Sequence, residues 1–195
     1  MAEEARSTEQ RILMTAIDCI NEEGINKVTV RMIAERADVN VAAVNYYFRS
    51  KDRMMHEAMN LALANMFEDV DEMLATVKDG RILMMKLLGF LLWGIEAYPG
   101  ITRSFLYPPV AGEETNGPML PGMQSLITRL RDRLAELCPN RRGEDLEAGI
   151  IAAFSTMLIG SVVPELFESY TAAGFGEENA RERLVAELTN MGVGG

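Results

Sequence analysis

The sequence is poor in residues that form disulfide frameworks and metal sites. Its 195 residues include two cysteines, Cys19 and Cys138, and one histidine, His56. Two cysteines so far apart give neither a disulfide framework nor a paired metal-ligand spacing, and this fits a reducing compartment. We therefore expect a cytoplasmic protein without a metal ion or other cofactor.

Long hydrophobic runs and an export signal are also missing. The first ten residues, MAEEARSTEQ, are acidic and polar, whereas a secretory signal starts with basic and then apolar residues. The uncharged stretch Ala148–Pro164 contains Ser155 and Thr156 and is shorter than the ~20 predominantly apolar residues that a membrane span needs. We expect a buried helix there and no membrane partner.

Groups that could carry out catalysis are few. His56 lies beside Glu57 on an expected helix, where a histidine is more often solvated than catalytic, and no glycine-rich phosphate loop is present. Cys19 lies at the edge of an apolar helix face, where packing is the simpler role. The carboxylate pairs Glu113-Glu114 and Glu177-Glu178 fall in expected loops or caps. The sequence therefore predicts a protein that is not an enzyme.

Positive charge is scarce overall but is not evenly distributed. The chain has 19 Lys and Arg against 29 Asp and Glu, a net charge of −10. Residues 1–53 carry 8 cations and 9 acids, a net of −1, whereas residues 54–195 carry 11 and 20, a net of −9. Because phosphates are neutralised locally, this distribution permits an N-terminal segment that binds DNA.

The apolar residues follow helical spacing along the chain, and no stretch alternates like a strand. This pattern predicts an all-α fold. We expect helices at about residues 8–23, 30–37, 41–48, 51–77, 80–98, 101–107, 123–137, 144–170 and 178–191, with the main loop at residues 108–122. Pro99-Gly100 is expected to stop the fifth helix and Pro108-Pro109 the sixth.

Several residues in the first fifty are typical of helix ends. Gly24 is placed as the C-terminal cap of the first helix. Thr29 and Asn40 are N-cap candidates for the second and third helices. Asp38 falls where the turn between those helices requires a left-handed residue, which Asp tolerates well. The sequence therefore predicts two short helices joined by a tight turn.

The third expected helix has two different faces. Three apolar residues lie within an arc of about 60° and are expected to face inward: Val41, Val44 and Phe48. The other face carries small or hydrogen-bonding groups: Ala42, Ala43 and Tyr46, with Asn45 and Tyr47 on its flanks. Such a surface favours the helix-turn-helix arrangement for the major groove. An ordinary helical hairpin with a solvated face is the alternative interpretation.

Each exposed residue could supply a distinct contact to DNA. Asn45 can pair with adenine through two hydrogen bonds, Ala42 and Ala43 can contact a thymine methyl group, and Tyr46 offers a hydroxyl. Thr29, Arg31 and Lys51 are candidates for phosphate contacts.

Residues 8–53 resemble the N-terminal domain of the TetR family of transcriptional regulators. The resemblance rests on a long first helix ending in Gly, on TVRMIAERADV, and on NYYFRSK. It implies a three-helix DNA-binding domain at residues 1–50, followed by a larger helical domain at residues 51–195 that binds an effector and forms a homodimer. It also implies that family DNA-contact positions correspond to Thr29, Ala42, Ala43, Asn45, Tyr46 and Lys51. The chain departs from the family's pattern at Asp38, where Gly is common, and at Val41, Ala42 and Ala43, the first recognition positions. Val41 is included among the candidate DNA contacts, and these departures leave the operator open.

The second domain is rich in Met and aromatic residues, which can line a ligand cavity. The candidates for effector binding are Met66, Phe67, Phe90, Trp93, Tyr98, Phe105, Tyr107, Phe154 and Tyr170. Most of them could instead be core. The family's architecture places a dimer interface at Ile151–Glu168 and Leu184–Leu188.

Together these features predict a ligand-responsive regulator, a repressor that binds palindromic operator DNA and is released by a small apolar or amphipathic effector. The alternative is an effector-free DNA-binding or adaptor protein whose second domain only dimerises.

Overall fold

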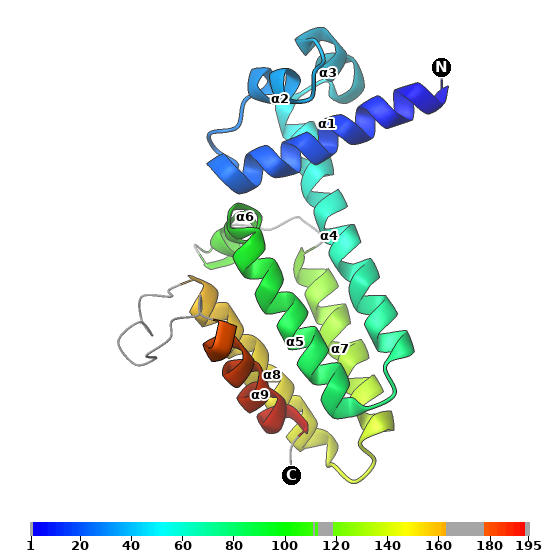
Figure 1. The fold of residues 1–195 in the computed structure, drawn as a ribbon, viewed down its shortest axis with the longest axis vertical. Coiled ribbons are helices and arrows are strands. Elements are labelled where there is room, and N and C mark those ends of the chain that lie inside the picture. Colours follow the sequence, from blue (N-terminus) through cyan, green and yellow to red (C-terminus); the bar gives the residue numbers. More distant parts are fainter. Residues whose placement is uncertain (1, 111, 113–118, 163–177, 194–195) are drawn as a thin grey trace. The chain divides into compact units, whose positions relative to one another are not determined.

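The computed structural model describes residues 2–110, 112, 119–162 and 178–193. These residues form helices without any strand (Figure 1), so the all-α prediction is confirmed. The helices are α1 (Ala2–Glu23), α2 (Val30–Arg36), α3 (Val41–Phe48), α4 (Lys51–Thr76), α5 (Gly80–Ala97), α6 (Pro99–Val110), α7 (Met119–Leu137), α8 (Gly143–Val162) and α9 (Glu178–Val193). Among the described helices, none by itself is long and apolar enough to cross a bilayer, although α5 and α6 taken together pass by length and composition.

The helices belong to two compact units. The first unit contains Met1–Met66 and Tyr98–Met119, and the second contains Phe67–Ala97 and Leu120–Gly195. Helix α4 runs without a break from the first unit into the second, whereas α6 belongs to the first. The division of roles that we predict at residues 50 and 51 stays a prediction.

The first unit has a core to which five helices contribute. Ile12 and Ile20 of α1, Ile33 of α2, Phe48 of α3 and Met54 of α4 are buried in one cluster, and Ile101 of α6 joins it. Burying a side chain of this size stabilises a fold by about 1.5–3 kcal/mol relative to leaving it exposed. The inward face predicted for the first helix thus forms one wall of this core.

Helix α6 contacts the C-terminal part of α1 at very short range. The Gly100 N–H donates to Asn21 Oδ1 at 3.1 Å, and a Cβ added to Gly100 would lie 2.4 Å from the carbonyl oxygens of Ile20 and Asn21. Only glycine permits this approach of one backbone to another.

Three predicted helix ends were wrong at prolines. Helix α6 begins at Pro99 and continues through Pro108, and α7 begins at Met119 with Pro121 in its first turn. Proline is tolerated in a first turn because the missing N–H would have no intrahelical partner there. Pro99 and Pro121 therefore start helices that the sequence pattern had placed later. Pro108 lies in the last turn of α6 without ending it at residue 107.

The second unit contains a close contact between α8 and α9, which lie side by side in Figure 1. A Cβ at Gly149 would lie 2.4 Å from the Gly192 Cα, and one at Gly192 would lie 2.9 Å from Met84 Cε of α5. Val185 and Leu188 of α9 are buried within the unit. The glycines therefore allow α9 to pack against both α8 and α5. The eighth helix, expected to reach residue 170, is described as far as Val162, and residues 163–170 lie outside the described part.

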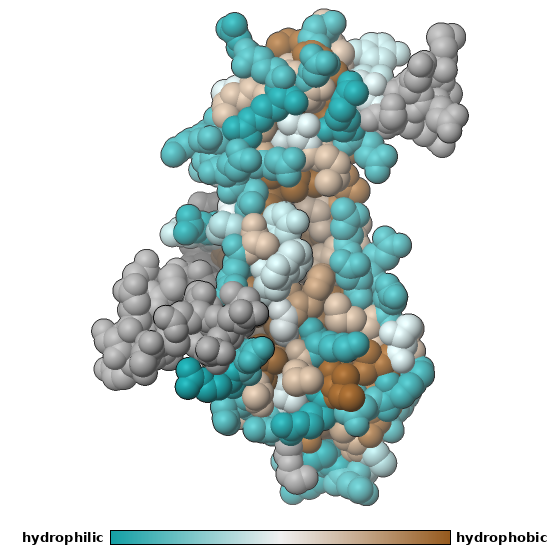
Figure 2. Space-filling model, viewed as in Figure 1, coloured by the Kyte–Doolittle hydropathy of each residue, from teal (hydrophilic) through white to brown (hydrophobic). Residues whose placement is uncertain are grey.

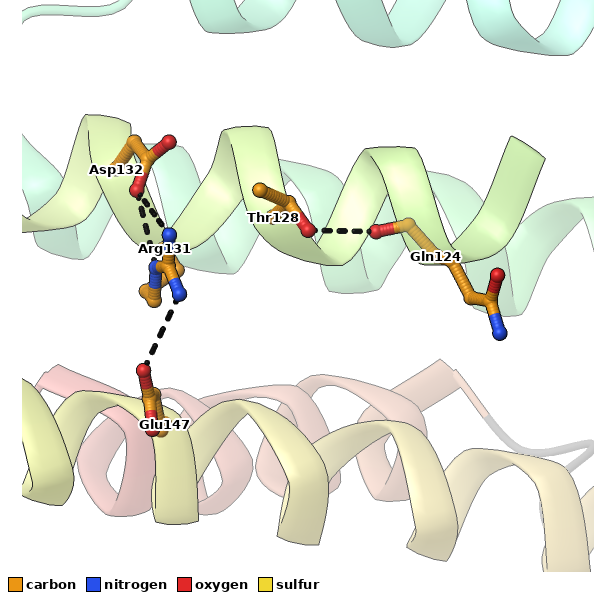
Figure 3. A network of polar contacts seen from close by, with 5 residues as sticks. All are labelled: Gln124, Thr128, Arg131, Asp132 and Glu147. Carbon is orange, nitrogen blue, oxygen red and sulfur yellow. Dashed lines mark hydrogen bonds and ion pairs between the residues drawn. The ribbon is translucent and has the colours of Figure 1, made fainter. Parts of the chain in front are cut away.

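An ion-pair network links α7 to α8 (Figure 3). Arg131 of α7 pairs with Asp132 at 2.7 Å and with Glu147 of α8 at 3.3 Å. One turn earlier, the Thr128 hydroxyl donates to the Gln124 carbonyl oxygen at 3.0 Å. Because these groups are largely exposed, the pairs contribute at most about 1 kcal/mol each.

Candidate nucleic-acid interface

The connection between α2 and α3 is fixed by local hydrogen bonds. Thr29 Oγ1 accepts from the Met32 N–H at 3.2 Å, and Asn40 Oδ1 accepts from the Ala43 N–H at 2.7 Å. Asp38 has a φ of 52°, and the Val39 N–H donates to the Ala34 carbonyl at 3.0 Å. Both predicted caps and the left-handed turn residue are confirmed. The turn holds α3 in a defined position against α2.

Helix α3 buries one side and exposes the other. Val44 and Phe48 are each 1% exposed, whereas Tyr46 is 81% exposed. Ala42 and Asn45 are exposed, and Ala43 and Tyr47 are half-buried. The outer side chains are therefore not part of the unit's core, as a surface that contacts DNA requires.

Val41 is the exception to the predicted inward face, because it is 41% exposed. It is the first residue of α3, and helix side chains tilt toward the N-terminus. The Val41 side chain therefore extends past the start of the helix, where no preceding turn covers it. The prediction that it faces the core was wrong, and its exposure agrees with its inclusion among the candidate DNA contacts.

Aromatic packing holds Tyr46 in place. The Tyr46 and Tyr47 rings meet edge to face, with centroids 5.4 Å apart and planes at 82°, a favoured geometry for aromatic pairs. Tyr47 in turn packs against the buried core of the unit. The Tyr46 hydroxyl is thus presented outward from a supported ring.

The cations around α3 differ in whether an acid neutralises them. Arg31 pairs with Glu35 at 3.2 Å and Arg53 with Glu57 at 2.7 Å, while Arg36 lies between Glu22 and Glu23 of α1. Within the described residues, Arg49 and Lys51 form no ion pair. These two cations directly follow α3, so they are available to a phosphate without first losing a partner.

Arg49 is a candidate that the sequence analysis missed. It is exposed and has a φ of 63°, and its N–H donates to the Asn45 carbonyl at 2.9 Å to close α3. A left-handed conformation costs a non-glycine residue roughly 1–2 kcal/mol. The sequence signal for this candidate was its position, since Arg49 stands between the last residue of α3 and Ser50. Ser50 caps α4, because its Oγ accepts from the Arg53 N–H at 3.2 Å.

The remaining ionisable groups of this unit show no catalytic arrangement in the described part of the chain. His56 is exposed, and no group of three or more His, Cys, Asp or Glu residues that could hold a metal was found among the described residues. Cys19 is fully buried, and burial raises the pKa of its thiol although Arg36 acts in the opposite direction. A protonated, inaccessible thiol fits a packing role.

Comparison with known proteins supports the helix-turn-helix interpretation of α2 and α3. Residues 12–58 match the model of the bacterial regulatory proteins of the tetR family, and this segment contains the whole α2–α3 pair. This N-terminal segment is a TetR-family DNA-binding domain. "Probable HTH-type transcriptional regulator YttP" of Bacillus subtilis is 39% identical over 54 residues, 28% of this chain and 26% of that protein.

A second relative covers more of this chain. "Nucleoid occlusion factor SlmA" of Alteromonas mediterranea is 30% identical over 111 residues, which are 57% of this chain and 50% of that protein. The chain thus spans a quarter to a half of the curated relatives that it matches.

The fold extends beyond the matched sequence. The solved structure of the regulator FadR from Bacillus subtilis, in complex with stearoyl-CoA, superposes with a TM-score of 0.62 and 14% identity. The match covers 94% of this chain and 98% of FadR. At this identity the likeness establishes a shared fold.

The predicted effector-binding residues are divided between the two units. In the first unit, Met66 is half-buried, Phe105 packs against the core, and Tyr98 and Tyr107 are 42% and 61% exposed. In the second, the Phe67 ring lies against Gly122, the Phe90 and Trp93 rings are 6.3 Å apart, and Phe154 is buried. Tyr170 lies outside the described residues. Phe90 and Trp93 form an aromatic pair, and the effector role of the set stays a prediction.

The predicted dimer segments differ in what they expose. On α8, Ile151, Leu158 and Ile159 are 59%, 39% and 48% exposed, and Ser155 is exposed between them. Gly160 is buried within the unit and is therefore not available for close approach to a second chain. The described part of α9 buries Val185 and Leu188, whereas Met191 is 54% exposed. The other exposed side chains of α9 are polar: Glu182, Arg183, Glu187 and Asn190. Most of the exposed apolar residues of these two helices thus lie on α8.

Proposed function

We propose that this protein is a transcriptional regulator that binds duplex DNA as a homodimer, with α3 in the major groove. The observation that carries the proposal is the outer face of α3, where Ala42, Asn45 and Tyr46 are exposed on a rigidly capped helix. These side chains contribute little to folding and match the chemistry of base edges. The TetR-family sequence match over residues 12–58 supports the same interpretation.

Contacts to the phosphates position α3 on the duplex. Lys51 and Arg49 supply cations at one end of α3, and Arg31 supplies a third if a phosphate replaces Glu35. Thr29 uses a lone pair of Oγ1 to cap α2, and its O–H stays available to donate to a phosphate. An exposed ion pair such as Arg31–Glu35 contributes only about 0.3–0.5 kcal/mol, so exchanging its partner costs little.

A dimer follows from the exposed apolar face of α8. Ile151, Ser155, Leu158 and Ile159 lie at spacings of four, three and one along the helix, which places them on one side. Burying this side against its copy in a second chain removes apolar surface from water. The two α3 helices would then contact successive major-groove faces of a near-palindromic operator, about 34–36 Å apart.

Regulation by a small apolar or amphipathic effector completes the proposal, with repression as the outcome of operator binding. FadR of B. subtilis, which shares the fold, was solved with stearoyl-CoA, an amphipathic molecule. Helix α4 is continuous between the two units and offers a direct path for coupling. A coupling free energy of ~1–3 kcal/mol would change operator affinity from about fivefold to over a hundredfold.

Selection of bound sequences from a random duplex pool tests this function. We expect an enriched near-palindrome, Lys51→Ala to weaken binding uniformly across sequences, and Asn45→Ala to relax one base preference by about 1–3 kcal/mol. Glu72→Ala, at an exposed position near the C-terminal end of α4, is the control and should leave binding unchanged. A pool without enrichment, or Asn45→Ala and Lys51→Ala with identical effects, would contradict the proposal.

An effector-free DNA-binding or adaptor protein is the second candidate. It is favoured by the 30% identity to a nucleoid occlusion factor over 111 residues and by the division of the aromatic set between two units. A metabolite library measured by thermal shift separates the two functions. A ligand that raises the melting temperature and lowers operator affinity supports the sensor, whereas a library without such a ligand supports the adaptor.

A further inference from the structure

The outer face of α3 has no charged side chain. Its eight residues are VAAVNYYF, and those exposed are Val41, Ala42, Asn45 and Tyr46. We propose that α3 recognises A·T base pairs, through thymine methyl groups and the adenine edge, and makes no direct contact that specifies guanine. This inference rests on the proposed DNA-binding function and names the base pairs that it selects.

The inference that no contact specifies guanine rests on the absence of Arg and Lys from α3. Guanine offers two acceptors, O6 and N7, in the major groove, and Arg or Lys is the side chain that pairs with them. The nearby cations Arg31, Arg49 and Lys51 all lie outside α3. A recognition helix contacts base edges mainly through its N-terminal residues, whereas Arg49 and Lys51 follow its C-terminal end. These cations are therefore placed for phosphates.

Val41 and Ala42 form an apolar pair at the N-terminal end of α3. Val41 is 41% exposed, and Ala42 beside it is also exposed, whereas Ala43 is half-buried. Thymine is the base that presents a methyl group in the major groove. The structure thus moves the predicted methyl contact from Ala42 and Ala43 to Val41 and Ala42, at the end of the helix that enters the groove.

Asn45 is the amide that remains free for adenine. Adenine offers an N6 donor and an N7 acceptor, which an amide satisfies with its oxygen and its NH₂ group. The Asn40 oxygen already accepts from the Ala43 N–H at 2.7 Å, so Asn40 cannot offer both groups. Asn45 is exposed, and its side chain forms no hydrogen bond with a described residue.

The test changes the DNA and leaves the protein intact, so misfolding cannot explain the result. The wild-type protein first selects duplexes from a random pool. In the selected site, each thymine is then replaced by uracil, which removes only the methyl group, and each adenine by 7-deazaadenine, which removes only N7. We expect a loss of roughly threefold to fivefold in affinity for each contacted methyl group. At the adenine that faces Asn45 we expect a loss of about fivefold or more.

Protein variants assign each effect to a side chain. Val41→Ala should abolish the penalty of one uracil, Val41→Ile should retain it, and Asn45→Ala should abolish the penalty of one 7-deazaadenine. The inference is overturned if the bases under α3 are invariant G·C pairs, or if uracil duplexes bind as tightly as thymine duplexes. A pool without any enrichment would instead contradict the proposed function itself, so the two failures are distinguishable.

Discussion

Helices α3 and α8 both carry outer faces that contribute little to their own units, yet the two faces differ in chemistry. On α3 the outer residues are small or hydrogen-bonding, and the large one, Tyr46, ends in a hydroxyl. On α8 they are Ile151, Leu158 and Ile159, with Ser155 between them. A polar, hydrated partner such as a base-pair edge suits the first face, and a second apolar surface suits the other. Figure 2, coloured by hydropathy, shows hydrophobic residues among hydrophilic ones on the face drawn there. The exposed apolar residues of the second unit also include Ile82, Met85 and Trp93 of α5.

The two sides of α3 provide the sharpest form of this comparison. Phe48→Ala should destabilise the first unit by about 3–5 kcal/mol, because it leaves a cavity in a core where Phe48 is 1% exposed. Tyr46→Ala, two residues away, should change stability by no more than about 0.5 kcal/mol while weakening DNA binding. Urea unfolding followed by circular dichroism measures the stability of both variants. Equal destabilisation by the two variants would mean that the outer face belongs to the core.

The apolar face of α8 can be tested in the same way. Ile151→Glu should weaken the dimer by about a hundredfold, or ~3 kcal/mol, because a carboxylate would be buried without a partner. The unfolding of the isolated chain should change little, since Ile151 is 59% exposed. Sedimentation equilibrium gives the dissociation constant, and Glu72→Ala at an exposed position of α4 is the control. A variant that dimerises like the wild type would place the interface elsewhere.

A smaller effect is expected at the end of α3. Arg49→Gly should raise the free energy of unfolding by about 1 kcal/mol, because glycine adopts a φ of 63° without steric cost. The same change should weaken DNA binding several-fold and lower the salt dependence by about one counterion per site. Arg49→Lys keeps the charge and should retain most of the binding. If stability and affinity rise together, Arg49 does not contact a phosphate.

The smallest expected effect is a difference in reactivity between the two cysteines, Cys19 in the first unit and Cys138 in the second. Burial raises the pKa of both thiols, and Asp79 raises that of Cys138 further. Cys19 is fully buried whereas Cys138 is half-buried, so Cys138 should react first with iodoacetamide, as followed by mass spectrometry. The folded thiols ionise at higher pH than the unfolded ones. Their contribution to the free energy of unfolding is therefore fully present below about pH 8.5 and is lost as the pH rises above it. Faster labelling of Cys19 would contradict this order.

The sequence was informative where a structural feature depends on neighbours within a few residues. The Thr29 and Asn40 caps each join residues three apart, and Asp38 adopts its left-handed conformation within a single turn. The bounds of α3 were predicted without error for the same reason. The inward side of that helix was predicted correctly at Val44 and Phe48 but not at Val41, because a periodic pattern does not account for the uncovered start of a helix.

The starts of α6 and α7 could not be derived from the local pattern. A proline both ends helices and begins them, and the pattern around Pro99 or Pro121 does not distinguish the two cases. The DNA-contact and effector residues remain predictions, since such sites are defined by a partner. Among the effector candidates, the structure adds that Phe105 packs in the first unit, which its position in the sequence did not indicate.

The sequence by itself determined the all-α fold, the capped α2–α3 hairpin and the small outer side chains of α3, because each depends on helix periodicity or on hydrogen bonds between near neighbours. Tertiary structure alone decided that α6 packs on α1, where Asn21 and Gly100 are 79 residues apart, and that Gly149 meets Gly192 between α8 and α9. It also decided which cations keep an acidic partner, such as Arg36 with Glu22 fourteen residues away. Contacts over such separations depend on how whole helices pack, and no local pattern of residues encodes them.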